Sequence, residues 1–234
     1  MTLPNWDSNC LSMEDHPVQL IHTIYEPPGP GPHPTILTLH GRGANAFDLL
    51  GLAPYICGGN FLLICPQAPM ETPIGPDAVG YAWYSMSQGG LPDIEGMLSS
   101  QRQLQNFLDE CLERYAIDLS KLVVLGFSQG GVMAYSLALA NPERFAALAA
   151  LSCWLPRELT PRLNIGEAVQ SLPTWVQHGI QDPQIEIDRA RDSVMRLREL
   201  KVPLTFKEYE MGHEIRPRSL MDLSAWLDKN VGLS

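Results

Sequence analysis

Short apolar segments recur along the chain, and each is bounded by glycine, proline or polar residues. They are rich in Val, Ile and Leu, which is typical of strands that are covered on both faces of a parallel sheet. We therefore predict central strands at residues 36–39, 61–65, 122–125, 145–151, 174–178 and 204–209, and an outer strand at residues 18–25.

Between these strands, apolar residues follow one another at steps of three and four, the spacing of a helix with one buried face. Asp93 and Asn45 precede two such segments and are suitable N-caps. The segment after Ser128 is apolar on every side, which predicts a fully buried helix. The other predicted helices cover residues 45–56, 94–115, 187–200 and 220–227, the last of them ending near Gly232.

The alternation of strands and helices from residue 36 onward predicts an α/β fold with a mostly parallel central sheet and helices on both faces. We expect one domain over residues 1–234, with residues 1–17 as a loosely ordered lead-in and residues 155–172 as a short helix and loop. Residues 66–92 hold many prolines and glycines and form the longest irregular stretch. Its aromatic side chains argue for a functional loop rather than disorder.

Composition narrows the classes of function. The chain has 16 basic and 26 acidic side chains, a formal charge of -10, and this balance does not favour nucleic acid or an anionic membrane as a partner. No apolar run is long enough for stable membrane insertion. The five cysteines are scattered and odd in number, and no basic segment precedes Arg42, so we expect reduced thiols in a cytoplasmic protein.

A Gly-x-Ser-x-Gly pentapeptide, Gly126 to Gly130, lies where the strand at residues 122–125 meets the buried helix. A sharp strand-to-helix turn at this point lifts the serine hydroxyl clear of the sheet, and the two glycines allow the helix to start against the strand. Ser128 is therefore the candidate nucleophile. The alternative interpretation is that this serine merely caps the helix.

A serine hydroxyl needs a base, and the order nucleophile, acid, histidine restricts the choice. Of the six histidines, only His178 and His213 follow Ser128, and His213 is favoured because an acid can precede it. Asp182 follows the strand at residues 174–178 and is the candidate acid, although Asp followed by Pro is also a common helix start. Asp188 and Asp192 are the weaker alternatives, since they fall inside a predicted helix.

Attack by a serine on a carbonyl group also requires two N–H groups that stabilise the negative charge on the carbonyl oxygen. One is expected from the residue after the nucleophile, Gln129, and the other from the turn after the strand at residues 36–39. That turn reads His-Gly-Arg-Gly, so we expect Arg42 to donate through its main chain. Otherwise the segment is a plain tight turn.

With these segments in order, the chain resembles the phospholipase/carboxylesterase family of α/β-hydrolases, which contains the acyl-protein thioesterases. The resemblance is carried by residues 39–43, 66–69, 81–84, 126–131, 182–183 and 212–214. It implies an α/β-hydrolase fold without a large lid domain, no cofactor or metal, and an acyl-binding cleft lined by Trp83, Tyr84 and Met86. The chain departs from the family pattern at Ala44 and at Gln184-Ile185, which affects substrate preference more than chemistry.

We therefore expect a serine hydrolase that cleaves small or lipid-like acyl esters or thioesters. Two alternatives remain at this point: an acyltransferase with the same triad, and a binding module on a hydrolase scaffold. Acyl chain length, the choice between ester and thioester, and the oligomeric state have no signal in the sequence.

Overall fold

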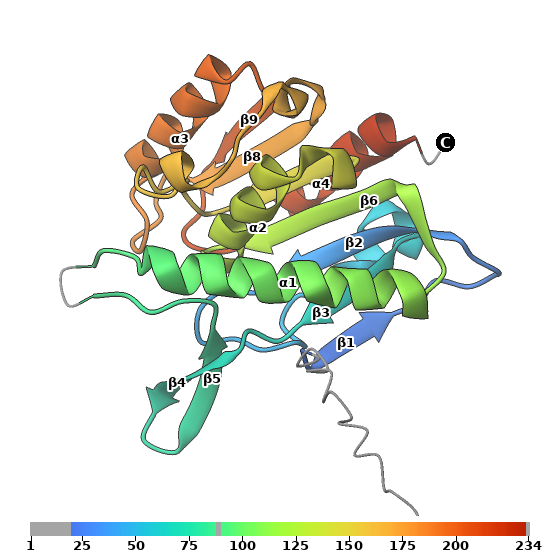
Figure 1. Ribbon diagram of the computed structural model, residues 1–234, viewed down its shortest axis with the longest axis horizontal. Coiled ribbons are helices and arrows are strands. Elements are labelled where there is room, and N and C mark those ends of the chain that lie inside the picture. The colour runs from blue at the N-terminus through green and yellow to red at the C-terminus, as the bar shows by residue number, and fades with distance from the viewer. Residues whose placement is uncertain (1–19, 88–89, 233–234) are drawn as a thin grey trace, which may run out of the picture.

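A seven-stranded sheet forms the centre of the computed structural model, which describes residues 20–87 and 90–232 (Figure 1). Strand β1 is antiparallel to its neighbour β3, and the remaining neighbours are parallel. In spatial order the strands are β1 His22–Tyr25, β3 Leu62–Pro66, β2 His33–Leu39, β6 Ile117–Phe127, β7 Ala147–Leu151, β8 Thr174–Gly179 and β9 Leu204–Tyr209. Every strand predicted for this sheet is present, and the mostly parallel arrangement is confirmed.

Helices cover both faces of the sheet, as the alternation of elements predicts. Helices α1 (Ile94–Arg114), α2 (Gln129–Ala140) and α3 (Ile187–Glu199) pack on one face, while α4 (Pro217–Val231) and the 3₁₀ turn η1 (Leu50–Tyr55) pack on the other. Strand β6 serves both cores, because successive side chains of a strand point to opposite faces. Leu122 and Val124 face the helices of the first set, and Val123 and Leu125 face those of the second.

The helix termini agree with the sequence at two points. Asp93 caps α1, since its Oδ1 accepts a hydrogen bond from the Gly96 N–H at 3.0 Å. Helix α2 is buried along almost its whole length, as expected for a helix without a polar face. Residues 1–17, expected as a loose lead-in, lie outside the described residues.

The prediction of a helix at residues 45–56 is wrong. The segment forms η1 and a second 3₁₀ turn, η2 (Cys57–Gly59), follows it. Asn45 does not cap a helix; its Oδ1 accepts a hydrogen bond from the N–H of Phe47, only two residues on, at 2.9 Å. Such a local bond favours a turn, and Pro54 has no N–H to donate to a helix. Together they explain why apolar spacing did not produce an α-helix.

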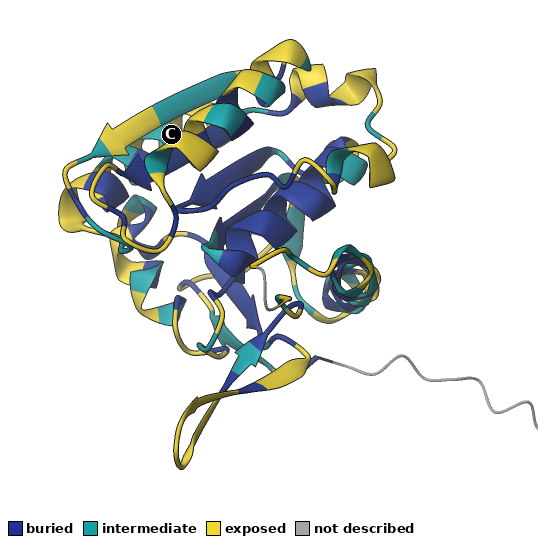
Figure 2. Cartoon of the chain, turned by 90° about the vertical axis from the view of Figure 1, so that its left-hand side faces the viewer, coloured by how far each residue is buried: buried dark blue, intermediate teal, exposed yellow. Residues whose placement is uncertain are grey.

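The prediction that residues 66–92 are irregular is wrong for their central part. Strands β4 (Met70–Gly75) and β5 (Ala78–Ala82) pair as an antiparallel hairpin that projects from the body, with much of its surface exposed (Figure 2). The prolines of this segment led the sequence analysis to predict an irregular loop instead of strands. Both strands are edges, and an edge strand tolerates a residue such as Pro73 that cannot donate to a ladder.

The remaining irregular segment, residues 155–172, contains two 3₁₀ turns, η4 (Thr160–Arg162) and η5 (Glu167–Ser171), which agrees with the mixed structure expected there; a further turn, η3 (Pro142–Arg144), follows α2. Among the described residues, no helix has the length and apolar character needed to cross a bilayer.

Candidate active site

Ser128 occupies the sharp turn between β6 and α2. Its φ of 53° and ψ of -120° lie outside the regions that residues with a side chain normally adopt. The strained backbone is held from two sides, because the Ser128 N–H donates to the Leu151 carbonyl at 2.9 Å and the Ser128 carbonyl accepts from the Gly131 N–H at 2.9 Å. The expectation that this serine sits in a strained strand-to-helix turn is therefore confirmed.

The two glycines of the pentapeptide make this turn possible. A Cβ on Gly130 would lie 2.0 Å from the Leu39 carbonyl oxygen, and a Cβ on Gly126 would lie 2.1 Å from the Gly130 carbonyl oxygen. Both contacts are with backbone and cannot be relieved by a rotamer change. Only glycine lets α2 begin this close to β2 and β6.

The structure brings Ser128, His213 and Asp182 into one hydrogen-bonded chain. The Ser128 Oγ lies 2.8 Å from His213 Nε2, and His213 Nδ1 lies 2.7 Å from Asp182 Oδ2. Since Nδ1 faces a carboxylate, it carries the imidazole proton, and Nε2 is left to accept a hydrogen bond from the serine hydroxyl. The Phe127 ring packs against the imidazole with a centroid separation of 4.9 Å and limits its rotation.

Asp182 is fixed by its own loop. Its Oδ1 accepts hydrogen bonds from the N–H groups of Gln184 and Ile185 at 2.8 and 2.9 Å. It does not cap α3, which starts five residues later with Glu186 at the N-cap position. The alternative acids are paired with arginines instead: Asp188 with Arg191, and Asp192 with Arg157 and Arg196.

His178, the alternative histidine, lies behind the acid rather than beside the nucleophile. It is fully buried, and its Nε2 lies 2.8 Å from the Ile185 carbonyl oxygen and 3.3 Å from Asp182 Oδ2. Because both neighbours are acceptors, Nε2 carries the proton. Burial lowers the pKa of His178 below its usual value, so the ring is neutral at neutral pH. The sequence analysis did not predict the contact between His178 and Asp182. The position of His178 at the end of β8, just before Asp182, was the available signal for it.

The turn after β2 is held by buried hydrogen bonds. The His40 Nδ1–H donates to the Gly41 carbonyl at 2.7 Å, and His40 Nε2 accepts from the Ala68 N–H at 3.0 Å. Burial lowers the pKa of His40 and keeps the ring neutral, as this pair of bonds requires. Within the described part of the chain, the Arg42 and Gln129 N–H groups donate to no protein acceptor, so both are free for a ligand.

The Gln129 side chain connects helix α2 to the bend that follows β5. Its Oε1 accepts from the Trp83 N–H, and its Nε2 donates to the Tyr84 carbonyl, both at 2.8 Å. Trp83 in turn donates its indole N–H to the His40 carbonyl at 2.9 Å. These buried bonds connect Gln129 to His40, at the start of the turn that contains Arg42.

A cavity of about 320 Å³ lies beside Ser128. Tyr84 and Met86 line it. Trp83 does not, because its fully buried indole is directed into the core toward His40. The cavity residues are Arg42, Tyr84, Met86, Gly90, Ser128, Gln129, Trp154, Gln184, Ile185 and Arg189, of which Trp154 and Arg189 had no signal in the sequence pattern.

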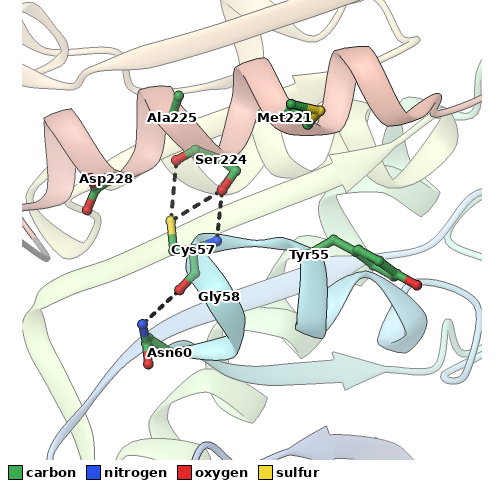
Figure 3. Close-up of a pocket in the computed structure, with 8 residues that line it drawn as sticks. All are labelled: Tyr55, Cys57, Gly58, Asn60, Met221, Ser224, Ala225 and Asp228. Carbon is green, nitrogen blue, oxygen red and sulfur yellow. Dashed lines mark hydrogen bonds between the residues drawn. The ribbon is translucent and has the colours of Figure 1, made fainter.

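A larger cavity, of about 560 Å³, lies between η2 and α4 and shares no residue with the first (Figure 3). Cys57 lines this cavity and makes two hydrogen bonds to Ser224. Its N–H donates to the Ser224 hydroxyl at 2.8 Å, and its Sγ donates to the Ser224 carbonyl at 3.3 Å. Burial raises the pKa of the Cys57 thiol and suppresses the reactive thiolate. The larger cavity therefore does not hold a reactive thiol, and the smaller cavity holds the Ser128 hydroxyl that is hydrogen-bonded to His213.

Comparisons with known proteins agree with the fold and identify the family. The chain is 26% identical to acyl-protein thioesterase 1 of Mycosarcoma maydis, over 87% of this chain and 93% of that protein. A probable carboxylesterase of Oryza sativa subsp. japonica is 25% identical, over 85% and 78% of the two chains. The crystal structure of the Bacillus cereus carboxylesterase superimposes with a TM-score of 0.77 at 20% identity, over 90% and 94% of the chains, which confirms the α/β-hydrolase fold. The family model for phospholipases and carboxylesterases matches residues 22–231, and the chain belongs to this family of ester-bond hydrolases.

Proposed function

We propose that the protein is a serine hydrolase that cleaves carboxylic esters or thioesters through an acyl-enzyme intermediate. The observation that carries the proposal is the unbroken chain from the Ser128 hydroxyl through His213 to the buried carboxylate of Asp182, with separations of 2.8 and 2.7 Å. Membership of a family of ester-bond hydrolases supports the same reaction class.

In the first half of the reaction, His213 Nε2 takes the proton of the Ser128 hydroxyl as Oγ attacks the acyl carbonyl carbon. Asp182 stabilises the imidazolium that forms and itself remains deprotonated. The carbonyl oxygen gains a negative charge, which the N–H groups of Arg42 and Gln129 stabilise. Each such donor lowers the barrier by about 3 to 4 kcal/mol.

The tetrahedral intermediate then collapses. The bond from the acyl carbon to the alkoxide or thiolate breaks, and the imidazolium gives its proton to that leaving group. In the second half, His213 deprotonates a water molecule, which attacks the acyl-serine ester. The serine leaves with the proton held by the imidazole, and a carboxylic acid is released.

The test is substitution of the nucleophile. Ser128→Ala should abolish turnover of 4-nitrophenyl acyl esters and of matched thioesters, and a fluorophosphonate probe should label the wild-type protein but not the variant. Ser120→Ala is the control, because that hydroxyl is exposed and bonds only to Asp118. The thermal midpoint should stay nearly constant in both variants. Equal turnover by Ser128→Ala and wild type would disprove the proposal.

A further inference from the structure

The cavity at the nucleophile has a charge opposite to that of the chain as a whole. The sequence has a formal charge of -10, yet the residues that line this cavity include two arginines, Arg42 and Arg189, and no Asp or Glu. A positive cleft in an acidic protein attracts anions locally, because the low-dielectric walls concentrate the field of the lining charges.

Neither guanidinium forms an ion pair with a carboxylate of the described residues. In residues 20–87 and 90–232, no carboxylate oxygen lies within 4.0 Å of either of these arginines. On the same helix as Arg189, by contrast, Arg191 pairs with Asp188 and Glu208, and Arg196 pairs with Asp192. The acid closest in sequence to Arg189 is therefore already occupied.

Arg189 is held over the cavity wall by an aromatic ring. Its guanidinium carbon lies 3.9 Å from the centroid of Trp154, whose side chain is mostly buried and also lines the cavity. Stacking uses the flat face of the guanidinium and leaves its N–H edge free to bind a planar anion with two bonds. The ring thus restricts the arginine without reducing its capacity to recognise a ligand.

Arg42 also lines the cavity, and it belongs to the turn that supplies a candidate N–H donor. Its Nη2 donates to the Thr72 hydroxyl of the hairpin at 3.3 Å, and its other N–H groups bond to nothing in the described chain. The two arginines therefore come from different elements and converge on one cavity that contains the Ser128 hydroxyl.

We propose that the part of the substrate that occupies this cavity carries an anionic group, a carboxylate or a phosphate, which Arg189 and Arg42 bind while Ser128 attacks the ester. The proposal rests on the proposed hydrolase function and adds the chemical class of its substrate. Both arginines are exposed, so water hydrates their guanidinium groups in the free protein. An anion at the end of the acyl chain would pair with these charges, whereas an uncharged chain would not.

The experiment compares three 4-nitrophenyl esters of equal chain length: the neutral hexanoate, the monoester of adipate with its terminal carboxylate, and the cationic 6-aminohexanoate. The kcat/KM of each ester is divided by its rate of hydrolysis in hydroxide, so that only recognition by the protein remains. We expect the adipate ester to exceed the hexanoate by roughly five- to tenfold, because hydrogen bonds between charged groups are the strong ones. The aminohexanoate should be the poorest, and added salt should reduce the preference.

Substitutions assign the preference to its residues. Arg189→Gln and Arg42→Gln should each bring the ratio of adipate to hexanoate several-fold closer to one, and Arg189→Lys should restore only part of it because it lacks the planar fork. Arg198→Gln is the matched control: it removes the same charge from an exposed position of the same helix outside the cavity, and the ratio should not change. An ester that ends in a phosphonate separates recognition of phosphate from recognition of a carboxylate.

The outcomes separate this proposal from the reaction itself. Hydrolysis of the hexanoate and adipate esters at equal corrected rates, or an equal ratio in Arg189→Gln and Arg198→Gln, would overturn the anionic substrate class and leave the hydrolase intact. If no ester is hydrolysed and Ser128 is not labelled by the fluorophosphonate, the hydrolase function fails and its substrate class with it.

Discussion

In the variant Asp182→Asn, the His213 imidazole should no longer be able to act as a base toward Ser128. The carboxylate accepts two backbone N–H bonds on Oδ1, from Gln184 and Ile185, and two imidazole N–H groups face Oδ2, from His213 at 2.7 Å and His178 at 3.3 Å. In Asp182→Asn the amide oxygen must take the Oδ1 position, because backbone N–H groups cannot reverse. The amide nitrogen, itself a donor, then faces the two imidazoles.

The magnitude follows from the tautomer that remains. His213 can accept from the new amide only if its proton moves from Nδ1 to Nε2, and that proton then points at the Ser128 Oγ 2.8 Å away. The ring can no longer take the serine proton. A triad with the wrong tautomer loses about 10³- to 10⁴-fold in kcat, which corresponds to roughly 4 to 5.5 kcal/mol of barrier. KM should change little, since Asp182 does not line the cavity.

The assay is steady-state hydrolysis of a 4-nitrophenyl ester by Asp182→Asn, with thermal unfolding as a check that the variant is folded. Asp188→Asn is the control, because Asp188 was the alternative acid, and its exposed carboxylate pairs only with Arg191. That variant should keep wild-type kcat. A folded Asp182→Asn protein with less than a tenfold loss would refute this account of the tautomer, as would an equal loss in the control.

Two further predictions concern stability. Gly130→Ala should lower the free energy of unfolding, measured in urea, by about 2 kcal/mol or more, because the new Cβ would lie 2.0 Å from the Leu39 carbonyl oxygen. Gly166→Ala is the control and should be nearly neutral, because the space around its Cβ is open; similar urea midpoints for the two variants would contradict the packing argument. His40 is held neutral by burial with its pKa lowered, so below about pH 6.5 the unfolded chain binds a proton that the folded chain does not, and stability should fall by up to about 1.4 kcal/mol per pH unit. Urea unfolding of wild type and His40→Gln across pH 5 to 7.5 checks this, and parallel curves would exclude His40 as the cause.

The sheet could be predicted because its strands have a local signature. Residues 122–125 are apolar without interruption since both faces of β6 are covered, and the helix that caps at Asp93 repeats its apolar residues at the steps of a helix. Parallel strands end at one edge, so Ser128, Asp182 and His213 could be placed together from topology alone. Their separations depend on side-chain packing and required the structure.

The wrong helix prediction at residues 45–56 has the local causes given above, whereas the other misses involve contacts between segments that are distant in sequence. The hairpin at residues 70–82 has no apolar alternation, because it is exposed and is stabilised by pairing with itself and with the turn at Ala44. The contact of His178 with the acid and the stacking of Arg189 on Trp154 each join two separate elements. No spacing rule along a single sequence predicts such pairs.

The hairpin has a consequence for the chemistry, since it adjoins the turn that would stabilise the oxyanion. Tyr81 of β5 accepts from the Gly43 N–H at 2.8 Å and donates to the Ala44 carbonyl at 2.9 Å, and Thr72 of β4 accepts from the Arg42 side chain. A donor contributes most when it is already oriented before charge develops. The hairpin bonds to the Arg42 side chain and to the main chain of the two residues that follow it, Gly43 and Ala44, so it orients the Arg42 N–H without using it. The prolines and glycines that make residues 66–92 look irregular therefore belong to the segment that would position half of the oxyanion hole.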